Sequence, residues 1–436
     1  MTSGRHIRSV MKTVNQLIND FEANVFDARL QALYLDDSRL EAEKERYIQA
    51  LKMFESLYGD QEVQIFSAAG RSEVSGNHTD HQHGRVLAAS INLDTIAIVS
   101  KREDDQIKVV SDDFDIEPVD VNDTELKDVE ENSASLIKGV VQGFKNDHFR
   151  VGGFNAYMTS EVIVGAGLSS SASFEVLIGT ILSYLYNEGN VSMVEISKIA
   201  QYAENVYFGK PCGLMDQCAC AVGGLITIDF KDPASPIVHQ VNTDFDDFGV
   251  SLCIVDTKGS HADLTDEYAA VPYEMKKVAH FFGSDVLRDV DEEAFLQNLS
   301  SIRKKVGDRA VLRAFHFFQE NARVPQIVEA LEKKDKGAFL KGIQESGDSS
   351  YQYLQNVFAA SDPAHQAISL ALALSKDFLK DKGVCRVHGG GFAGTILAFV
   401  DNEDVASYKE WIESFFGADS CHVLKIRPEG GTIVVE

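Results

Sequence analysis

Residues 164–173 read VGAGLSSSAS and lead directly into an apolar, periodic segment at 174–186 that we expect to be a helix. Two glycines allow the backbone to approach a ligand closely, and the first N–H groups of a helix point towards an anion. Three consecutive serines add hydroxyl donors and can supply a ligand for Mg²⁺. The stretch predicts a phosphate-binding loop, although a Gly/Ser run can also be an ordinary turn and helix cap. The Walker pattern GxxxxGK[ST] is absent from the sequence, so the loop is of another kind.

A second polar segment, GRSEVSGNHTDH, occupies residues 70–81. It places a cation, an amide, an imidazole and a carboxylate within a short stretch. Each hydroxyl of a sugar needs a donor or an acceptor, so such a density of polar groups suits a polyhydroxylated ligand. A polar loop with capping residues is the alternative interpretation.

Two further segments carry glycines beside polar groups. Residues 209–217 read GKPCGLMDQ, in which Asp216 is a lone carboxylate before an apolar run. Such an aspartate is either a buried structural group or a base positioned by its surroundings. Residues 386–394 read RVHGGGFAG. Three glycines in a row permit close backbone packing, a loop that lines a nucleotide, or simply a tight turn.

These four segments, in this order, resemble the signature motifs of the GHMP kinases (galactokinase, homoserine kinase, mevalonate kinase and phosphomevalonate kinase), and most of all those of the galactokinases. The family's GR-x-N-L-I-G-E-H-T-D is similar to residues 70–80, and its G-x-G-L-S-S-S-A matches residues 165–172 without a gap. Its C-G-I-M-D-Q matches residues 212–217, and its G-G-G-F-G-G resembles residues 389–394. An ordered set of four motifs is far more specific than any one of them.

The resemblance implies transfer of the ATP γ-phosphoryl group to the anomeric hydroxyl of galactose, giving α-D-galactose 1-phosphate. It assigns Asp216 to the reacting hydroxyl as base or orienting acceptor, and Arg71 to the charge that develops on the transferring group. It assigns Mg²⁺ to Ser171 and Glu204. The nucleotide phosphates would be held by the backbone of the loop, namely Gly165, Gly167, Leu168, Ser169, Ser170, Ser171, Ala172 and Ser173.

The sugar itself is assigned by the resemblance to residues from two of the segments and one further stretch: Asn77, His78, Asp80, Gly213 and Tyr268. Asp216 and Arg71 lie far apart in sequence and would have to meet beside the anomeric oxygen. An adjacent arginine should lower the pKa of Asp216 and keep it ionised.

The sequence departs from the family pattern at several positions. Asn77 stands where galactokinases have Glu, a residue associated with the sugar 6-hydroxyl; Glu73 stands where they have Asn, and His388 where they often have Thr. An amide at 77 can still form hydrogen bonds but carries no negative charge. Loss of that charge would remove repulsion against a 6-carboxylate, so galacturonate or another sugar is the alternative substrate. A metal site at His81 and His83 is disfavoured, since no third ligand is suitably spaced.

The resemblance implies an α+β, two-domain GHMP fold, with an N-terminal domain of the ribosomal-protein-S5 domain 2-like type. We expect a helical N-terminal extension over 1–58, an N-terminal kinase domain over 59–235 and a C-terminal α+β domain over 236–436. The stretch 231–236 is the best candidate for the linker between them. The extension is predicted to pack on the main body as amphipathic helices, and a partner-binding arm is its alternative.

Composition restricts the partners. The formal net charge of −26 disfavours nucleic acid and anionic membranes, which are themselves densely negative. Neither a signal sequence nor a run of roughly 20 apolar residues is visible, which predicts a cytoplasmic protein. The six cysteines show no zinc-site spacing and are expected to be reduced. A non-catalytic sugar and ATP sensor is the alternative from another functional class; oligomeric state is not predicted.

Overall fold

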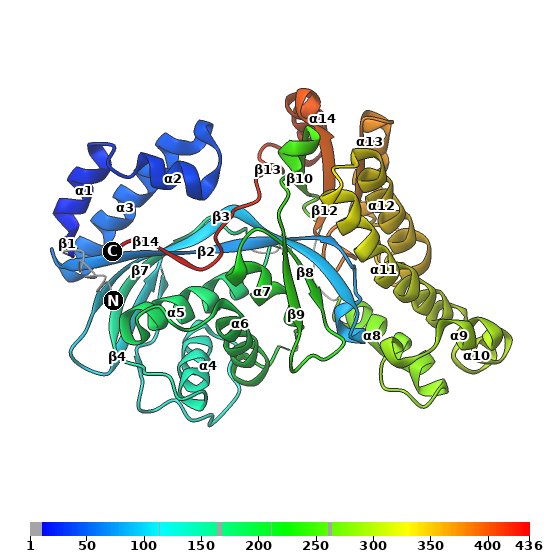
Figure 1. Cartoon of the computed structure of the whole chain (residues 1–436), viewed down its shortest axis with the longest axis horizontal. Coiled ribbons are helices and arrows are strands. Elements are labelled where there is room, and N and C mark those ends of the chain that lie inside the picture. Colours follow the sequence, from blue (N-terminus) through cyan, green and yellow to red (C-terminus); the bar gives the residue numbers. More distant parts are fainter. Residues whose placement is uncertain (1–10, 113, 164–167, 211, 260–263) are drawn as a thin grey trace, which may run out of the picture.

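The chain forms two β-sheets with helices packed against them (Figure 1). The computed structural model describes residues 11–112, 114–163, 168–210, 212–259 and 264–436. Helices and strands are interspersed along the chain, in agreement with the predicted α+β fold.

The first sheet is organised around a long antiparallel pair, β2 (Glu62–Ser75) and β3 (Arg85–Lys101). β3 also pairs with β7 (Phe154–Ser160), which runs parallel to β4 (Gln106–Ser111). The short remaining strands of this sheet are β1 (Lys12–Thr13), β5 (Phe114–Asp115), β6 (Val119–Asp120), β8 (Leu225–Asp229), β9 (Ile237–Val241) and β14 (Thr432–Val435).

Both faces of the first sheet are covered, because both faces of its central strands are apolar. On β3, Ala97 and Val99 belong to the core shared with the helices on one face, whereas Ile96 and Ile98 belong to the core on the other. This alternation is the period-2 pattern of a strand. The helices on the first face are α4 (Ser133–Asn146), α5 (Ser170–Asn187), α6 (Met193–Tyr202) and α7 (Met215–Val222).

The second face is covered by the N-terminal helices, which lie above the sheet in Figure 1. They are α1 (Val14–Glu22), α2 (Asp27–Tyr34) and α3 (Leu40–Tyr58). Their apolar stripe, including Leu17, Tyr47 and Phe54, is fully buried against the sheet. The prediction that this extension packs on the main body as amphipathic helices is confirmed for its described part.

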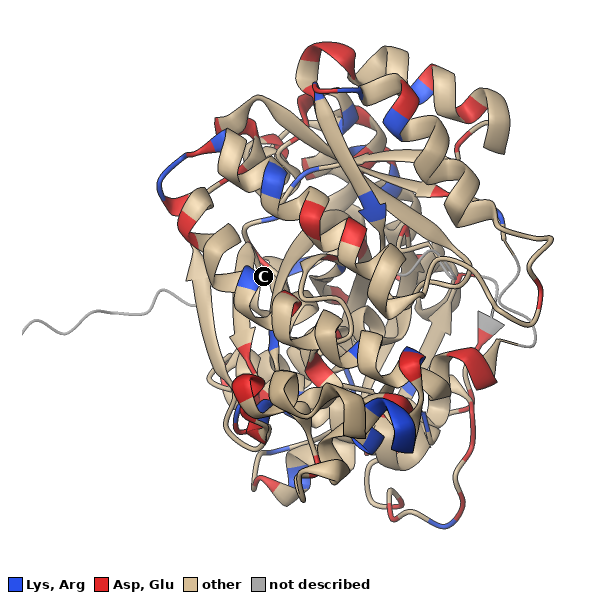
Figure 2. Cartoon of the chain, turned by 90° about the vertical axis from the view of Figure 1, so that its right-hand side faces the viewer, with Lys and Arg blue, Asp and Glu red and all other residues tan. Residues whose placement is uncertain are grey.

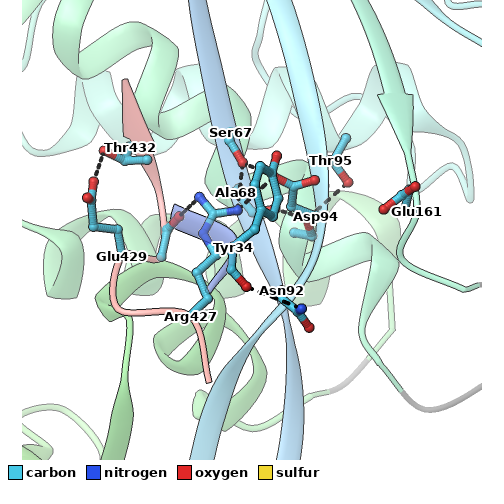
Figure 3. Close-up of polar contacts among 12 residues, drawn as sticks. Tyr34, Ser67, Ala68, Asn92, Asp94, Thr95, Glu161, Arg427, Glu429 and Thr432 are labelled. Atoms are coloured by element: carbon cyan, nitrogen blue, oxygen red, sulfur yellow. Dashed lines mark hydrogen bonds and ion pairs between the residues drawn. The ribbon is translucent and has the colours of Figure 1, made fainter. Parts of the chain in front are cut away.

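A buried ionic cluster fastens these helices and the C-terminal segment to the sheet (Figure 3). Asp94 on β3 accepts hydrogen bonds from Arg427 Nη1 at 2.7 Å, Arg46 Nη1 at 2.6 Å and the Tyr34 hydroxyl at 2.7 Å, and also from Ser67. Burial alone would raise the pKa of Asp94, but the two guanidinium groups and the Ser67 hydroxyl outweigh it and hold the pKa below its usual range. The carboxylate is therefore kept ionised by its partners.

The second sheet is antiparallel, in the order β11-β12-β10-β13. Its strands are β10 (Val250–Asp256), β11 (Gly383–Val387), β12 (Thr395–Asp401) and β13 (Cys421–Leu424). The helices of this half are α8 (Thr265–Phe281), α9 (Glu292–Gln297), α10 (Leu299–Val306), α11 (Asp308–Glu332), α12 (Lys336–Ser349), α13 (Ala367–Leu379) and α14 (Val405–Phe416). Several of them form the helical layer at the right of Figure 1.

The predicted linker at 231–236 is wrong. Asp229 of β8 pairs with Ile237 of β9, so these residues form the loop of a hairpin within the first sheet. Asp and Pro, which suggested a linker, are equally typical of such a loop. The chain reaches the second sheet only after β9, and β14 returns to pair with β2. The domain limits 59–235 and 236–436 remain a prediction.

The outer surface carries many acidic positions, which Figure 2 shows distributed over the helices and loops of one side. The chain as a whole has a formal net charge of −26. Within the described ranges, no helix has the length and apolar character needed to cross a bilayer.

We predict that Asp94→Asn lowers the free energy of unfolding by about 3–5 kcal/mol, because it leaves the buried Arg427 and the largely buried Arg46 without their shared counter-charge. Chemical denaturation of the whole chain measures this. Asp123→Asn, which removes an exposed ion pair with Lys127, is the control and should change little. Because the pKa of Asp94 is depressed, its stabilisation is present above its unfolded pKa and is lost as the pH falls through the folded value. Equal stability of the two variants would contradict the role given to Asp94.

Candidate active site

A cavity of about 480 Å³ brings three of the four sequence motifs together. Its volume lies in the range of small-molecule sites. Its wall is formed by Arg71, Glu73, His78, Asp80, His81, Cys212, Gly213, Met215, Tyr268, Pro272, Gly389 and Gly390. Residues from both halves of the chain thus enclose one space.

Arg71 lines this cavity and is in contact with Asp216, as the resemblance required. Arg71 projects from β2, and Asp216 is the second residue of α7. Arg71 Nε donates to Asp216 Oδ1 and Nη2 to Oδ2, both at 2.8 Å, in a bidentate ion pair. The Asp216 side chain keeps 29% of its surface exposed, so a ligand can reach it. Burial pushes its pKa upwards, but Arg71 and a serine hydroxyl reverse this, and the pKa lies below the ordinary value.

That serine is Ser169, in the predicted phosphate loop. Its hydroxyl donates to Asp216 Oδ2 at 2.5 Å, and its backbone has φ +59°, a left-handed conformation that costs a non-glycine residue of the order of 1 kcal/mol or more. The hydrogen bond from Ser169 therefore holds the loop against Asp216, the candidate catalytic residue. Sequence reasoning placed Ser169 in the loop but did not anticipate its contact with Asp216, since nothing in the spacing reveals it.

The other predicted loop residues divide into two groups. Ser170 and Ser171 begin α5 and are half-buried, so their first-turn N–H groups suit an anion. Leu168, Ala172 and Ser173 are buried, and the Ser173 hydroxyl donates to Ala68 O at 2.8 Å, which fixes α5 to the sheet. Their side chains are structural. Gly165 and Gly167 lie outside the described residues.

Glu204 and Ser171 also meet, at a distance of 3.0 Å between the hydroxyl and Oε1. Glu204 lies in the π-helical turn η3 (Ala203–Phe208), a feature often found at functional sites. Gln217 Nε2 donates to Glu204 Oε2 at 2.7 Å and to Glu175 Oε2 at 3.2 Å. Glu175 Oε1 is buried without a hydrogen-bond partner in the part of the chain that the structure describes. Burial, and then the nearby Glu204, raise the pKa of Glu175 well above its ordinary value.

The predicted sugar residues His78, Asp80 and Gly213 line the cavity. His78 Nε2 donates to Gly390 O at 3.0 Å, which leaves His78 Nδ1 to accept from His81 Nε2 at 3.3 Å. A Cβ atom at Gly213 would lie 2.3 Å from Asp80 Oδ2, so only glycine permits this approach. Burial raises the pKa of Asp80, partly offset by His78.

Tyr268 closes the cavity from the second half of the chain. Its hydroxyl donates to Gly391 O at 2.8 Å, and its ring packs edge-on against Phe392. Burial raises the pKa of Tyr268 to about 12, so the hydroxyl stays protonated as a donor.

Asn77 is placed differently from its neighbours. Its side chain is fully buried, and it lies behind the cavity wall. Its Nδ2 donates to Glu73 Oε1 and Gly389 O, and its Oδ1 accepts from Asn356 and Ser350. The structure does not bring Asn77 to a position where it could contact a ligand, contrary to the expectation of direct sugar contact.

The wall also contains residues that sequence reasoning gave no role, namely Glu73, His81, Met215 and Pro272. Glu73 alone carried a usable signal, since it departs from the family pattern. Cys212 Sγ lies 3.4 Å from Glu204 Oε2. Burial, and to a smaller extent the charge of Glu204, raise the pKa of the Cys212 thiol well above its ordinary value. It is therefore not a reactive thiolate.

Comparison with known proteins decides the family. Residues 135–224 match the family model described as the GHMP kinases N terminal domain, and residues 52–101 match the galactokinase galactose-binding signature. A galactokinase of Streptomyces coelicolor is 30% identical over 371 residues, covering 84% of this chain and 92% of the relative. One from Actinobacillus pleuropneumoniae serotype 3 is 32% identical over 364 residues, covering 82% and 90%. The chain belongs to the galactokinase family.

Solved structures share the fold of this chain. Galactokinase of Lactococcus lactis, solved in complex with galactose, superposes with a TM-score of 0.74 at 24% identity, over 87% of this chain and 98% of that structure. A mevalonate kinase gives 0.57 at 16% identity, over 84% and 99%. The predicted GHMP fold is confirmed, and the chain is a phosphotransferase.

We predict that Asp216→Asn lowers the turnover rate at least about 100-fold, because the amide cannot accept a proton or balance Arg71 in the same way. Steady-state kinetics measure this, with the exposed Asp246→Asn as control. Since Arg71 keeps the Asp216 pKa below its ordinary value, the wild type should show no loss of kcat/KM from Asp216 between about pH 5 and 8. Near-normal turnover in Asp216→Asn would remove the catalytic assignment.

Proposed function

We propose that the protein transfers the γ-phosphoryl group of ATP to the anomeric hydroxyl of galactose, giving α-D-galactose 1-phosphate and ADP. The observation that carries this is the contact of Asp216 with both Arg71 and Ser169. Arg71 lines the sugar-sized cavity and Ser169 belongs to the phosphate loop, so the Asp216 carboxylate links the cavity wall to the loop. Galactokinase relatives at about 30% identity over most of the chain support galactose as the acceptor.

Asp216 and Arg71 have complementary tasks in this proposal. The anomeric hydroxyl donates to the ionised Asp216, which orients the oxygen and can take its proton as the O–P bond forms. The bond between the γ-phosphorus and the bridging oxygen breaks, and ADP leaves. Arg71 beside them stabilises the negative charge spread over the transferring group. Such reactions depend mainly on in-line positioning and charge stabilisation.

The residues present fit a magnesium ion bound with the nucleotide. Ser171 and Glu204 offer hard oxygen ligands beside the loop, and the unpartnered buried oxygen of Glu175 marks a site short of donors. Within the described ranges no group of three or more His, Cys, Asp or Glu could hold a metal by itself. Mg²⁺ bound with a nucleotide usually takes one or two protein ligands and completes its shell with phosphate and water. The ion would neutralise charge on the phosphates.

Galacturonate is less well supported than galactose. The loss of charge at position 77 suggested that a sugar carboxylate could be accepted. However, the carboxylates of Glu73 and Asp80 both line the cavity and would repel one. Nothing in the described site favours a sensor without activity, because Asp216 and Arg71 are in contact.

We also propose a cytoplasmic location. The six cysteines are all free thiols, several of them deeply buried, as expected in a reducing compartment. ATP as a substrate is in keeping with the same compartment.

We expect ATP-dependent ADP release with galactose and little with galacturonate, glucose or arabinose, measured across a sugar panel with mevalonate as an off-class control. Turnover of galacturonate in preference to galactose would overturn the choice of substrate. Binding of sugar and ATP with no turnover of any sugar would favour the sensor instead.

We predict that Glu204→Gln raises the Mg²⁺ concentration for half-maximal rate by about 10- to 100-fold, because it removes a charged oxygen ligand. A Mg²⁺ titration at saturating galactose and ATP measures this. Glu188→Gln, at an exposed position after α5, is the control. An unchanged Mg²⁺ requirement would exclude Glu204 as a ligand.

A further inference from the structure

In the sugar motif, two positions carry each other's residue type when compared with the family pattern. Glu73 stands where the pattern has Asn, and Asn77 stands where it has Glu. The two side chains touch, with Asn77 Nδ2 donating to Glu73 Oε1 at 3.0 Å. The chain therefore retains one carboxylate and one amide in contact, at reversed positions.

The amide of this pair has no capacity left for a ligand. Asn77 Nδ2 lies between two acceptors, Glu73 Oε1 and Gly389 O at 2.7 Å. Its Oδ1 accepts from Asn356 Nδ2 at 2.9 Å and Ser350 Oγ at 3.2 Å. All four hydrogen-bonding positions of a side-chain amide are thereby used. Contact with a sugar would require breaking a fully buried hydrogen bond, which is costly.

The carboxylate of the pair is in the opposite situation. Glu73 lines the cavity, and both of its hydrogen bonds converge on one oxygen, Oε1. The second donor is Arg386 Nη2 at 2.6 Å, from a guanidinium that is completely buried. Within the described part of the chain, Glu73 Oε2 receives no hydrogen bond. A carboxylate oxygen at a cavity wall, in a group paired with an arginine, is a strong acceptor for a hydroxyl.

A third residue that departs from the family pattern also contacts Glu73. His388 stands where the family often has Thr, and its Nε2 accepts from the backbone N–H of Glu73 at 3.3 Å. Its Nδ1 therefore carries the proton and donates to Thr395 Oγ1 at 2.9 Å. Two other positions that depart from the pattern thus contact Glu73, Asn77 at its carboxylate and His388 at its backbone N–H.

We propose that Glu73 is the carboxylate that reads a non-reacting hydroxyl of the sugar, in place of the residue at position 77. Asn77, Arg386 and His388 are positioning residues that fix Oε1 and the backbone and leave Oε2 towards the cavity. The reacting hydroxyl is separate, because Asp216 and Arg71 serve it. This inference rests on the proposed function, since it names a determinant of the specificity of the same site.

The test is kcat/KM on galactose and its 2-, 3-, 4- and 6-deoxy analogues, for wild type and Glu73→Gln. Wild type should lose about 10- to 100-fold at one hydroxyl through the bond to Glu73, the range for hydrogen bonds to charged groups. Glu73→Gln should lose most of that selectivity at the same hydroxyl and keep the others. Asn77→Ala should weaken the same preference alone, which a general loss of stability would not do.

Glu320→Gln is the matched control. Glu320 is a buried carboxylate on α11 that is paired with Arg323 and receives the backbone N–H of Gly76 at 2.9 Å. It contacts the same motif from behind the wall, so its loss should lower stability and leave the profile across the deoxy sugars unchanged. Should Glu73→Gln fail to fold because Arg386 loses its counter-charge, Glu73→Asp keeps the charge and shortens the reach by one methylene.

The outcomes separate the two proposals. Wild type that turns over no galactose would overturn the proposed function. Wild type that turns over galactose, with an unchanged deoxy-sugar profile in both Glu73 variants, would overturn only the role of Glu73. A wild type that is indifferent to every non-reacting hydroxyl would do the same without any variant.

Discussion

A charge removed from water must find a partner, and this protein places three of its buried arginines where separate parts of the chain join. Arg427 pairs with Asp94 where the C-terminal segment and the N-terminal helices meet the first sheet. Arg386, from the second sheet, pairs with Glu73 on β2. Arg71 pairs with Asp216, which ties β2 to α7. The two pairs at the cavity both depend on β2, so the pairing that positions the elements also positions the site.

This constraint explains why the cavity wall is built from both halves of the chain. Side chains two apart on a strand point to the same side, so Arg71 and Glu73 face one space from the end of β2. The second half supplies the counter-charge to Glu73 and the backbone oxygens of Gly389 and Gly390 that fix Asn77 and His78. A substitution in the second sheet can therefore alter sugar selectivity without any contact with the sugar.

The sequence was sufficient to predict the fold family, the meeting of Arg71 with Asp216 and that of Ser171 with Glu204, because ordered motifs carry those positions. It could not predict that Asn77 is saturated, since this depends on Asn356 and Ser350, which belong to no motif. The strained backbone of Ser169 was equally invisible, because serine does not signal a left-handed conformation. The linker was misplaced because a hairpin loop and a linker share the same composition, and only strand pairing distinguishes them.

The return of β14 to β2 has a consequence for how the chain is made. A ribosome releases the N-terminal end first, and early segments often fold while synthesis continues. Here Arg427, one of the two arginines paired with Asp94, and the strand β14 that covers part of one edge of β2 are synthesised long after Asp94 and β2. Until these residues emerge, the nascent first half must hold Asp94 with Arg46 as its guanidinium partner and leave part of one edge of β2 open. Loss of Arg427 and β14 would therefore disturb a part of the protein that is synthesised much earlier.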